Sequence, residues 1–313
     1  FRIPKDSKIE FKDLVKGEQS FSTDDLDDFI VRKKDNTPTF MFANAIDDSL
    51  MGVDLVLRGD DHLSNTPRQI ALLEALGLSL PRYAHVSLFT GSDGAPLSKR
   101  NGSISINDLR EQGYLPIAVS NYLSRVGHTI VDNDLKTHSE LADEFKIDNI
   151  SSSPSKFDMD QLLYWQKKAV EELNINECSI WLKDSLEGLP ASVNHENFVA
   201  LIKDNINFPH EAQEYLNNLF LTPLAQREEI INIIKSAGKE FYLQACDAIP
   251  SEILDWNETT KNIGSITGKK GKELFMPLRC AITGQTKGPE LDRVVNLIGT
   301  ERVLKKLKEA SEL

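Results

Sequence analysis

Two kinds of hydrophobic pattern divide this chain of 313 residues. In roughly the first third, short apolar runs rich in β-branched and aromatic residues lie between turn residues, a pattern typical of buried strands. The predicted strands are residues 37–47, 53–59 and 82–90. Between the last two we expect a helix with Thr66 as N-cap, Pro67 in its first turn and Gly77 as its left-handed stop. Strand, loop and helix in this order indicate an α/β fold.

Beyond the third strand the pattern is helical to the end of the chain. Thr137 with Glu140, and Asp158 with Gln161, have the spacing of capping boxes, and each pair predicts a helix start. From about residue 176 apolar positions recur at helical spacing with short breaks between the segments. The sequence therefore predicts an α/β part, a connecting helical part and an all-helical C-terminal domain.

Composition adds limits to this picture. With 40% hydrophobic residues the chain is long enough for two or three domains. Its three cysteines lie far apart and none is in a CxxC pair, which argues against a disulfide framework and a thiolate zinc site. No apolar run reaches eighteen residues, and the first residues lack the apolar core of a signal peptide. We expect a soluble cytoplasmic protein without a metal site.

The charge distribution offers one candidate surface for nucleic acid. A net charge of −12 weighs against phosphate contacts, but residues 261–279 gather positive charge. The predicted tRNA-contacting residues there are Lys269, Lys270, Lys272 and Arg279. Two alternatives stay open: a solvated lysine-rich loop, or a core helix whose entrance the lysines solvate.

A second cationic feature lies in residues 91–103, "GSDGAPLSKRNGS". Its glycines allow the loop to move, and Ser98, Lys99 and Arg100 could meet an anion that forms or departs during a reaction. A short basic triplet is a weak signal by itself.

The context of this loop strengthens the signal. "LVLRGDDHLSNTPRQIALLEALG", then "LSKRNG", "GYLPIAVSNYLSRVG" and "FDMDQLLYW", and finally residues 269–303, closely resemble bacterial glutamyl-tRNA synthetases of class I. The resemblance spans nearly the whole chain. It implies the α/β remnant of a class I Rossmann-type catalytic domain over 1–84, a mainly helical stem-contact region with the KMSKS-type loop over 85–175, and an all-α anticodon-binding domain over 176–313.

The resemblance also implies a nucleotide site. Lys99 would hold the triphosphate of ATP while pyrophosphate departs, assisted by Ser98 and Arg100, and a cation placed where negative charge redistributes lowers the barrier. Phe89 would contact the adenine. Asp61 and His62 would border the nucleotide, although a helix-entry cap explains those two residues equally well.

The same resemblance implies an amino-acid site. Arg58 would grip the carboxylate of glutamate at the end of its strand, and Asn44 and Phe40 would line the same pocket. An ion pair of Arg58 with Asp54, Asp60 or Asp61 is the alternative. The family usually has Tyr at the position of Phe40, so a hydroxyl contact is absent.

One family signature is missing. No HIGH-type stretch occurs in the 313 residues, which begin at Phe1 in what resembles the middle of the catalytic domain. We therefore expect an N-terminally truncated glutamate–tRNA ligase that is inactive alone and otherwise uses ATP with Mg²⁺, glutamate and tRNA(Glu), as a monomer without a tightly bound cofactor. A non-catalytic tRNA-binding module is the alternative, and a helical scaffold without nucleic-acid affinity is a third option.

The helical tail separates relatives within the superfamily. Glutaminyl-tRNA synthetases and eukaryotic glutamyl enzymes have β-barrel anticodon domains, and glutamyl-queuosine enzymes have none. A tail without strand pattern resembles the helical cage of the bacterial glutamyl enzymes. Lys287 departs from the family, which usually has His there.

The signature loop generates the first testable prediction. In a full-length enzyme, Lys99→Ala should slow adenylate formation far more than it weakens glutamate binding, because it removes one electrostatic contact to the polyphosphate, worth about 3 kcal/mol of barrier. Pyrophosphate exchange with tRNA present measures this rate. Equal activity of the variant would remove Lys99 from the mechanism.

Overall fold

The computed structural model describes residues 1–91, 94–95, 97, 104–130, 132–222, 227–251, 253 and 255–313. The chain divides into two compact units. Unit 1 comprises Phe1–Ile106 and Pro116–Trp165, and unit 2 comprises Asn107–Leu115 and Gln166–Leu313. The three-part division expected from the sequence, with boundaries near 84 and 175, stays a prediction.

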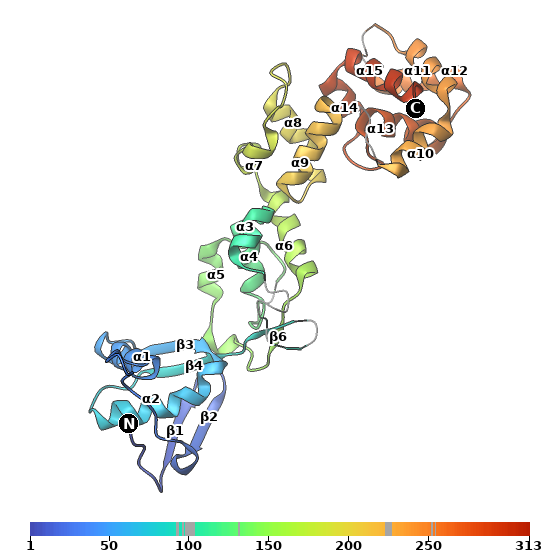
Figure 1. The fold of residues 1–313 in the computed structure, drawn as a ribbon. Helices are drawn as coiled ribbons and strands as arrows, with labels where there is room; N and C mark the ends of the chain where they lie inside the picture. The colour runs from blue at the N-terminus through green and yellow to red at the C-terminus, as the bar shows by residue number, and fades with distance from the viewer. Residues whose placement is uncertain are drawn as a thin grey trace. The chain divides into compact units, whose positions relative to one another are not determined.

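Unit 1 contains a four-stranded sheet (Figure 1). Its strands are β1 (Lys8–Asp13), β2 (Gly17–Ser22), β3 (Leu55–Gly59) and β4 (Arg82–Val86), in the spatial order β2-β1-β4-β3. β1 and β2 form an antiparallel hairpin that the sequence pattern did not predict, whereas β1, β4 and β3 run parallel. The carboxyl ends of β3 and β4 therefore meet at one edge, the place where open α/β sheets bind ligands, whereas β1 ends opposite Tyr83, near the start of β4.

The predicted strand over 37–47 is wrong, because most of this segment belongs to helix α1 (Phe40–Leu50). Ala45 and Ser49 are buried, and Phe42 and Ile46 pack against the same apolar cluster. These four positions have the spacing of one helix face, with a period of 3.6 residues. The aromatic residues at the start of the run hid this period.

Helix α2 (Thr66–Ala75) follows the short 3₁₀ helix η2 (Asp60–Asn65). The predicted stop is confirmed, since Gly77 has a φ of +66°. The predicted cap is wrong by one residue: Asn65 is the N-cap and Thr66 is the first helical residue. The hydroxyl of Thr66 is bonded elsewhere, in the polar network described below.

The predicted strand over 82–90 is interrupted after Val86. β5 (Phe89–Thr90) does not continue β4 but pairs in parallel with β6 (Ser155–Lys156) in a second, two-stranded sheet. The remaining regular elements are α4 (Pro116–Leu123), α5 (His138–Glu144), the 3₁₀ helices η1 (Thr23–Asp25) and η3 (Ile147–Asn149), and the start of α6 (Met159–Glu172). The capping box of Thr137 with Glu140 is confirmed. The box of Asp158 with Gln161 is confirmed in part, because Asp158 accepts from the backbone N–H of Gln161 but its own N–H donates to the hydroxyl of Tyr122.

Unit 2 is helical throughout its described residues, as expected for 176–313. Besides α3 (Ile106–Gln112) and the rest of α6, its α-helices are α7 (Ile175–Trp181), α8 (His195–Ile202), α9 (Pro209–Leu216), α10 (Glu228–Ala237), α11 (Lys239–Ala248), α12 (Trp256–Thr267), α13 (Lys272–Thr283), α14 (Leu291–Ile298) and α15 (Thr300–Ser311). The 3₁₀ helices η4 (Lys183–Leu186) and η5 (Lys203–Asn205) and the π-helical turn η6 (Asn217–Leu221) complete it. Figure 1 shows α10 to α15 in orange and red.

One continuous apolar core holds unit 2 together. Helix α14 illustrates how the sequence specifies it, because Leu291, Val294, Val295 and Ile298 are buried at positions i, i+3, i+4 and i+7. None of the helices in the described part of the chain is sufficiently long and apolar to span a membrane.

Candidate functional site

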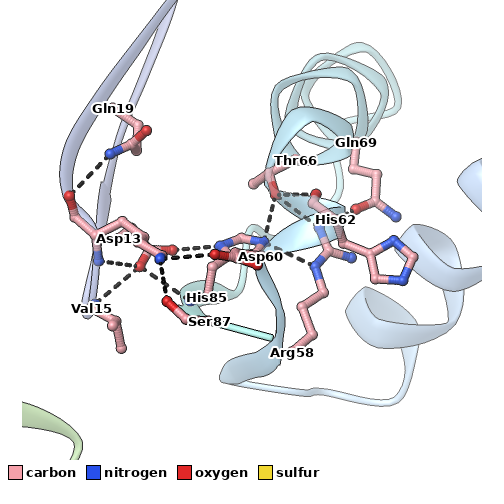
Figure 2. A network of polar contacts seen from close by, with 11 residues as sticks. Asp13, Val15, Gln19, Arg58, Asp60, His62, Thr66, Gln69, His85 and Ser87 are labelled. Carbon is pink, nitrogen blue, oxygen red and sulfur yellow. Dashed lines mark hydrogen bonds and ion pairs between the residues drawn. The ribbon is translucent and has the colours of Figure 1, made fainter. Parts of the chain in front are cut away.

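Three polar residues meet at the carboxyl edge of the parallel strands. Asp13 ends β1, where it pairs with Tyr83 of β4, and Arg58 in β3 is the register partner of His85 in β4. Figure 2 shows their side chains in one network that also reaches Thr66 and Gln69 of α2. The topology of the sheet thus gathers residues that are far apart in the sequence.

Asp13 and His85 form a fully buried pair. Asp13 Oδ2 lies 2.6 Å from His85 Nδ1, and both side chains have an exposed fraction of 0%. The other carboxylate oxygen, Oδ1, accepts from the backbone N–H groups of Val15, Lys16 and His85 at 2.8–3.1 Å. A buried charge is tolerated only with such complete hydrogen bonding.

The environment shifts the pKa of both partners. Burial by itself raises the pKa of the Asp13 carboxyl, but hydrogen bonds from the Lys16 N–H and from His85 outweigh it and hold that pKa below its usual value. Burial lowers the pKa of His85, and the positive charge of Arg58 acts in the same direction. The pair is therefore an aspartate with a neutral histidine at pH 7.

The neighbours of His85 define where its single proton lies. Arg58 Nε donates to His85 Nε2 at 3.1 Å, and a guanidinium has no acceptor. Nε2 must therefore carry the lone pair, and the proton sits on Nδ1, where it faces Asp13. Thr66 Oγ1 is also 3.1 Å from His85 Nε2.

Arg58 is held by neutral acceptors. Besides its bond to His85, its Nη2 donates to Thr66 Oγ1 at 2.8 Å and to Gln69 Oε1 at 2.7 Å. Its Nη1 donates to Asn44 Oδ1 at 3.3 Å. Burial lowers the pKa of Arg58, yet an arginine stays charged in proteins.

The alternative of an ion pair between Arg58 and a neighbouring aspartate is wrong. Asp54 pairs with Arg82 at 3.2 Å, Asp60 pairs with Lys16 at 2.9 Å, and Asp61 lies 3.8 Å from His62. Among the described residues no carboxylate lies within 4.0 Å of the Arg58 guanidinium. Its positive charge is thus left without a direct counterion.

Of the residues predicted for the amino-acid site, Asn44 contacts Arg58 and Phe40 lies against His62. Asn44 Oδ1 accepts from Arg58 and, at 3.1 Å, from Gln69 Nε2, which fixes the orientation of its amide. The ring of Phe40 is 55% exposed and lies 5.3 Å from the ring of His62. Phe40 and Asn44 are four residues apart in α1 and therefore share one face of that helix.

Asp61 and His62 occupy the 3₁₀ turn that follows β3. Neither caps a helix, since the N-caps of η2 and α2 are Gly59 and Asn65, so the cap alternative is wrong. A Cβ at Gly59 would lie 2.5 Å from Asp61 Oδ1, so a larger residue at this position would displace the carboxylate. The carboxylate of Asp61 thus lies close to the end of β3.

The nucleotide residues are only partly covered by the structure. Phe89 belongs to β5, where its ring lies 6.3 Å from that of Phe157, and its carbonyl accepts from the Leu97 N–H. Ser98, Lys99 and Arg100 lie outside the described residues, so their predicted role stays a prediction.

Sequence reasoning missed five members of this network. They are Asp13, Lys16, Thr66, Gln69 and His85. A histidine inside the apolar run "RYAHV" and an aspartate ending "KIEFKD" were the available signals, because a polar residue in a buried strand needs a partner. Which partner it has depends on strand pairing, which the sequence pattern did not supply.

Lys16 joins three segments at the same edge. Its Nζ donates to Asp60 Oδ2 at 2.9 Å, to Ser87 Oγ at 2.7 Å and to the Ser152 carbonyl at 2.7 Å. The side chain is 15% exposed. The β1–β2 hairpin is thereby tied to the segments that follow β3 and β4.

The predicted basic surface lies in unit 2, between α12 and α13. The alternative of a core helix is confirmed in part, since α13 buries Leu274, Leu278 and Ile282. Lys269 Nζ lies 3.7 Å from Glu273, and Arg279 Nη1 donates to the Pro289 carbonyl at 2.9 Å. The side chains of Lys270 and Lys272 are exposed.

Comparison with known proteins covers both units. Residues 1–164 match the family "tRNA synthetases class I (E and Q), catalytic domain", and residues 182–311 match an "Anticodon binding domain". Glutamate–tRNA ligase 1 of Halorhodospira halophila is 45% identical over 313 residues, covering 100% of this chain and 65% of the relative. Glutamate–tRNA ligase 2 of Nitrosococcus oceani is 43% identical over 308 residues, covering 98% and 65%.

A solved structure is also similar. The crystal structure of a glutamate tRNA ligase from Elizabethkingia meningosepticum in complex with its amino acid has a TM-score of 0.86 and 25% sequence identity, covering 100% of this chain and 67% of that one. The chain thus spans 65% of the length of the two curated relatives named above.

The buried histidine predicts a pH-dependent stability. Because burial lowers the pKa of His85, the unfolded chain takes up a proton near pH 6.5 that the folded chain does not. The free energy of unfolding of unit 1 should therefore fall as the pH drops below about 6.5, by at most about 1.4 kcal/mol per pH unit from this residue. Urea unfolding at pH 7.5 and 5.5 measures the effect.

His85→Gln provides the control for this measurement. The variant lacks the titrating imidazole, so the difference in unfolding free energy between the two pH values should be smaller than in the unmodified chain. An equal difference in both proteins would contradict the assignment.

Proposed function

The chain belongs to the class I tRNA synthetases of the glutamate and glutamine group, and from that premise we propose that it serves the ATP-dependent ligation of glutamate to tRNA(Glu). In this reaction the glutamate carboxylate attacks the α-phosphate of ATP, pyrophosphate leaves, and the glutamyl group passes to the terminal ribose of the tRNA. Arg58 and its neighbours are the proposed receptor for the carboxylate, and the lysines near the start of α13 are the proposed basic surface.

The observation that carries the proposal is the state of Arg58. Four of its five N–H groups donate to neutral acceptors, and the fifth, on Nη1, has no acceptor among the described residues. The guanidinium is thus rigid and charged, and it keeps one donor at the carboxyl edge of the sheet. A charge-assisted hydrogen bond to a substrate carboxylate suits this arrangement.

The surroundings of Arg58 fit an amino-acid substrate. Asn44 of α1 contacts it, and the exposed Phe40 lies one turn earlier in the same helix, so a polar and an apolar side chain are proposed to line the rest of the site. Phe40 offers no hydroxyl, and the ring of His62 packs against it instead. We propose that these residues bind glutamate together with Arg58.

ATP is proposed to bind beside this pocket. Asp61 and His62 follow the end of β3, and Phe89 follows the end of β4, so all three come from the ligand-binding edge of the fold. Lys99, assisted by Ser98 and Arg100, is proposed to hold the polyphosphate, on the strength of the signature loop. Mg²⁺ would arrive with ATP as part of the substrate.

The tRNA is proposed to contact unit 2. Lys270 and Lys272 are exposed just before and at the start of α13, and the one acidic residue near them in the sequence, Glu273, lies 3.7 Å from Lys269. Lysines in this position neutralise backbone phosphates without reading sequence. Lys269 and Arg279 have protein partners already, and they are proposed as secondary contacts. We propose that the protein acts in the cytoplasm, where tRNA is aminoacylated, and that it is a monomer.

Arg58→Ala tests the amino-acid site. In the protein that contains this chain, the variant should raise the KM for glutamate about 100-fold, because a charge-assisted contact worth about 3 kcal/mol is lost, while the KM for ATP changes little. Pyrophosphate exchange with tRNA present measures both constants.

Arg82→Ala is the matched control for this substitution. Arg82 starts the neighbouring strand, and among the described residues its one ion pair is with exposed Asp54, so its loss should leave both constants within about twofold. An unchanged glutamate KM in Arg58→Ala would refute the proposed carboxylate contact.

Titration of tRNA against the 313-residue chain tests the basic surface. The affinity should fall as salt rises, and Lys270→Ala/Lys272→Ala should reduce the slope of log K against log salt by about two, since two phosphate contacts are lost. The control is Lys305→Ala/Lys308→Ala, which removes two exposed lysines of α15. Binding without salt dependence, or an equal loss in both double variants, would count against this surface.

A further inference from the structure

We propose that Asp13 and His85 are positioning residues for Arg58. The Asp13 carboxylate selects the His85 tautomer whose Nε2 accepts from Arg58, and this bond orients the guanidinium toward the substrate carboxylate. The inference rests on the proposed function of Arg58 and adds two residues that touch no substrate.

The first step is that the two carboxylate oxygens of Asp13 bind different partners. Oδ1 accepts from three backbone N–H groups, those of Val15, Lys16 and His85. Oδ2 faces the imidazole, 2.6 Å from Nδ1 of His85. The backbone bonds lock the carboxylate in place, so Oδ2 always presents an acceptor to Nδ1.

The second step is the choice of tautomer. An acceptor at Nδ1 requires the proton on Nδ1 and leaves the lone pair on Nε2. Since the side chains of both partners are fully buried, solvent does not compete for either nitrogen. Asp13 therefore decides that His85 offers an acceptor on the side that faces Arg58.

The third step is the orientation of the guanidinium. Arg58 Nε donates to His85, and Nη2 donates to Thr66 and Gln69. One N–H of Nη1 donates to Asn44. The contact to Nε fixes the rotation of the planar group about the side chain, which the Nη contacts alone would leave less constrained. The remaining N–H of Nη1 then points in one direction, and preorganised donors bind an anion at lower cost.

An isosteric substitution isolates this mechanism. In Asp13→Asn the three backbone N–H groups keep the amide oxygen at the position of Oδ1, so the NH₂ group replaces Oδ2 and donates to Nδ1 of His85. The imidazole must then carry its proton on Nε2, where it opposes the N–H of Arg58 Nε. The same exchange in serine proteases preserves geometry but produces the wrong histidine tautomer.

A double-mutant cycle provides the functional test. Asp13→Asn should raise the glutamate KM about 10- to 100-fold in tRNA-dependent pyrophosphate exchange, with little change in the ATP KM. His85→Gln places an amide oxygen near the position of Nε2 and should stay within about fivefold of the unmodified protein. In this background Asp13→Asn should have almost no further effect on glutamate, because no tautomer remains to be selected.

The tautomer itself is measured on the 313-residue chain. The ¹⁵N chemical shifts of His85 should report a proton on Nδ1 in the unmodified chain and on Nε2 in Asp13→Asn. If Asp13→Asn does not fold, His85→Asn replaces it: this side chain is too short to reach Arg58, so its glutamate KM should exceed that of His85→Gln by about tenfold.

The outcomes separate this inference from the proposed function. If Arg58→Ala raises the glutamate KM but Asp13→Asn does not, the positioning role is wrong and the carboxylate contact stands. If Arg58→Ala itself has no effect, the proposed function of Arg58 fails, whereas the tautomer measurement still tests the link between Asp13 and His85. Equal effects of Asp13→Asn with and without His85→Gln would overturn the positioning role, since a merely structural aspartate would act independently of the histidine.

Discussion

The hydrogen bond between Asp13 and His85 is the constraint around which unit 1 is organised at its binding edge. It joins the ends of β1 and β4, two strands separated by some seventy residues of chain, and it does so with an ionised group that solvent does not reach. A buried carboxylate is stable only while each of its oxygens is bonded. The turn after β1, the backbone of β4 and the imidazole of His85 therefore all donate hydrogen bonds to the Asp13 carboxylate.

This arrangement explains the unusual electrostatics of Arg58. Every described acceptor that holds the guanidinium is neutral, while Asp54 pairs with Arg82, Asp60 pairs with Lys16, and Asp61 lies 3.8 Å from His62. A counterion next to Arg58 would have to be displaced before an anionic ligand could bind. The fold instead holds the guanidinium rigidly with neutral groups and leaves its charge available for an anionic ligand, although a buried charge without a counterion lowers the stability of the folded chain.

Local patterns revealed much of the fold. The strand at 53–59, the stop at Gly77, the cap at Thr137 and the helices of unit 2 were predicted correctly, and the family matches confirm the resemblance. Helix α1 was missed because its aromatic run obscured a period of 3.6 residues. Arg58, Asn44 and Phe40 were predicted as site residues through the resemblance, and this stays a prediction, whereas Asp13 and His85 escaped notice, since their pairing arises from strand register and not from neighbouring sequence.

The ammonium of Lys16 has a consequence for how this chain can vary. Three N–H bonds meet three oxygens contributed by Asp60, Ser87 and Ser152, so the valence of the group is saturated in a tripod. A planar guanidinium directs its donors in a fork and could not satisfy the same three points. If arginine replaced Lys16, at least one of these three oxygens would lose its hydrogen bond unless the segment of Ser87 or Ser152 shifted to meet the guanidinium.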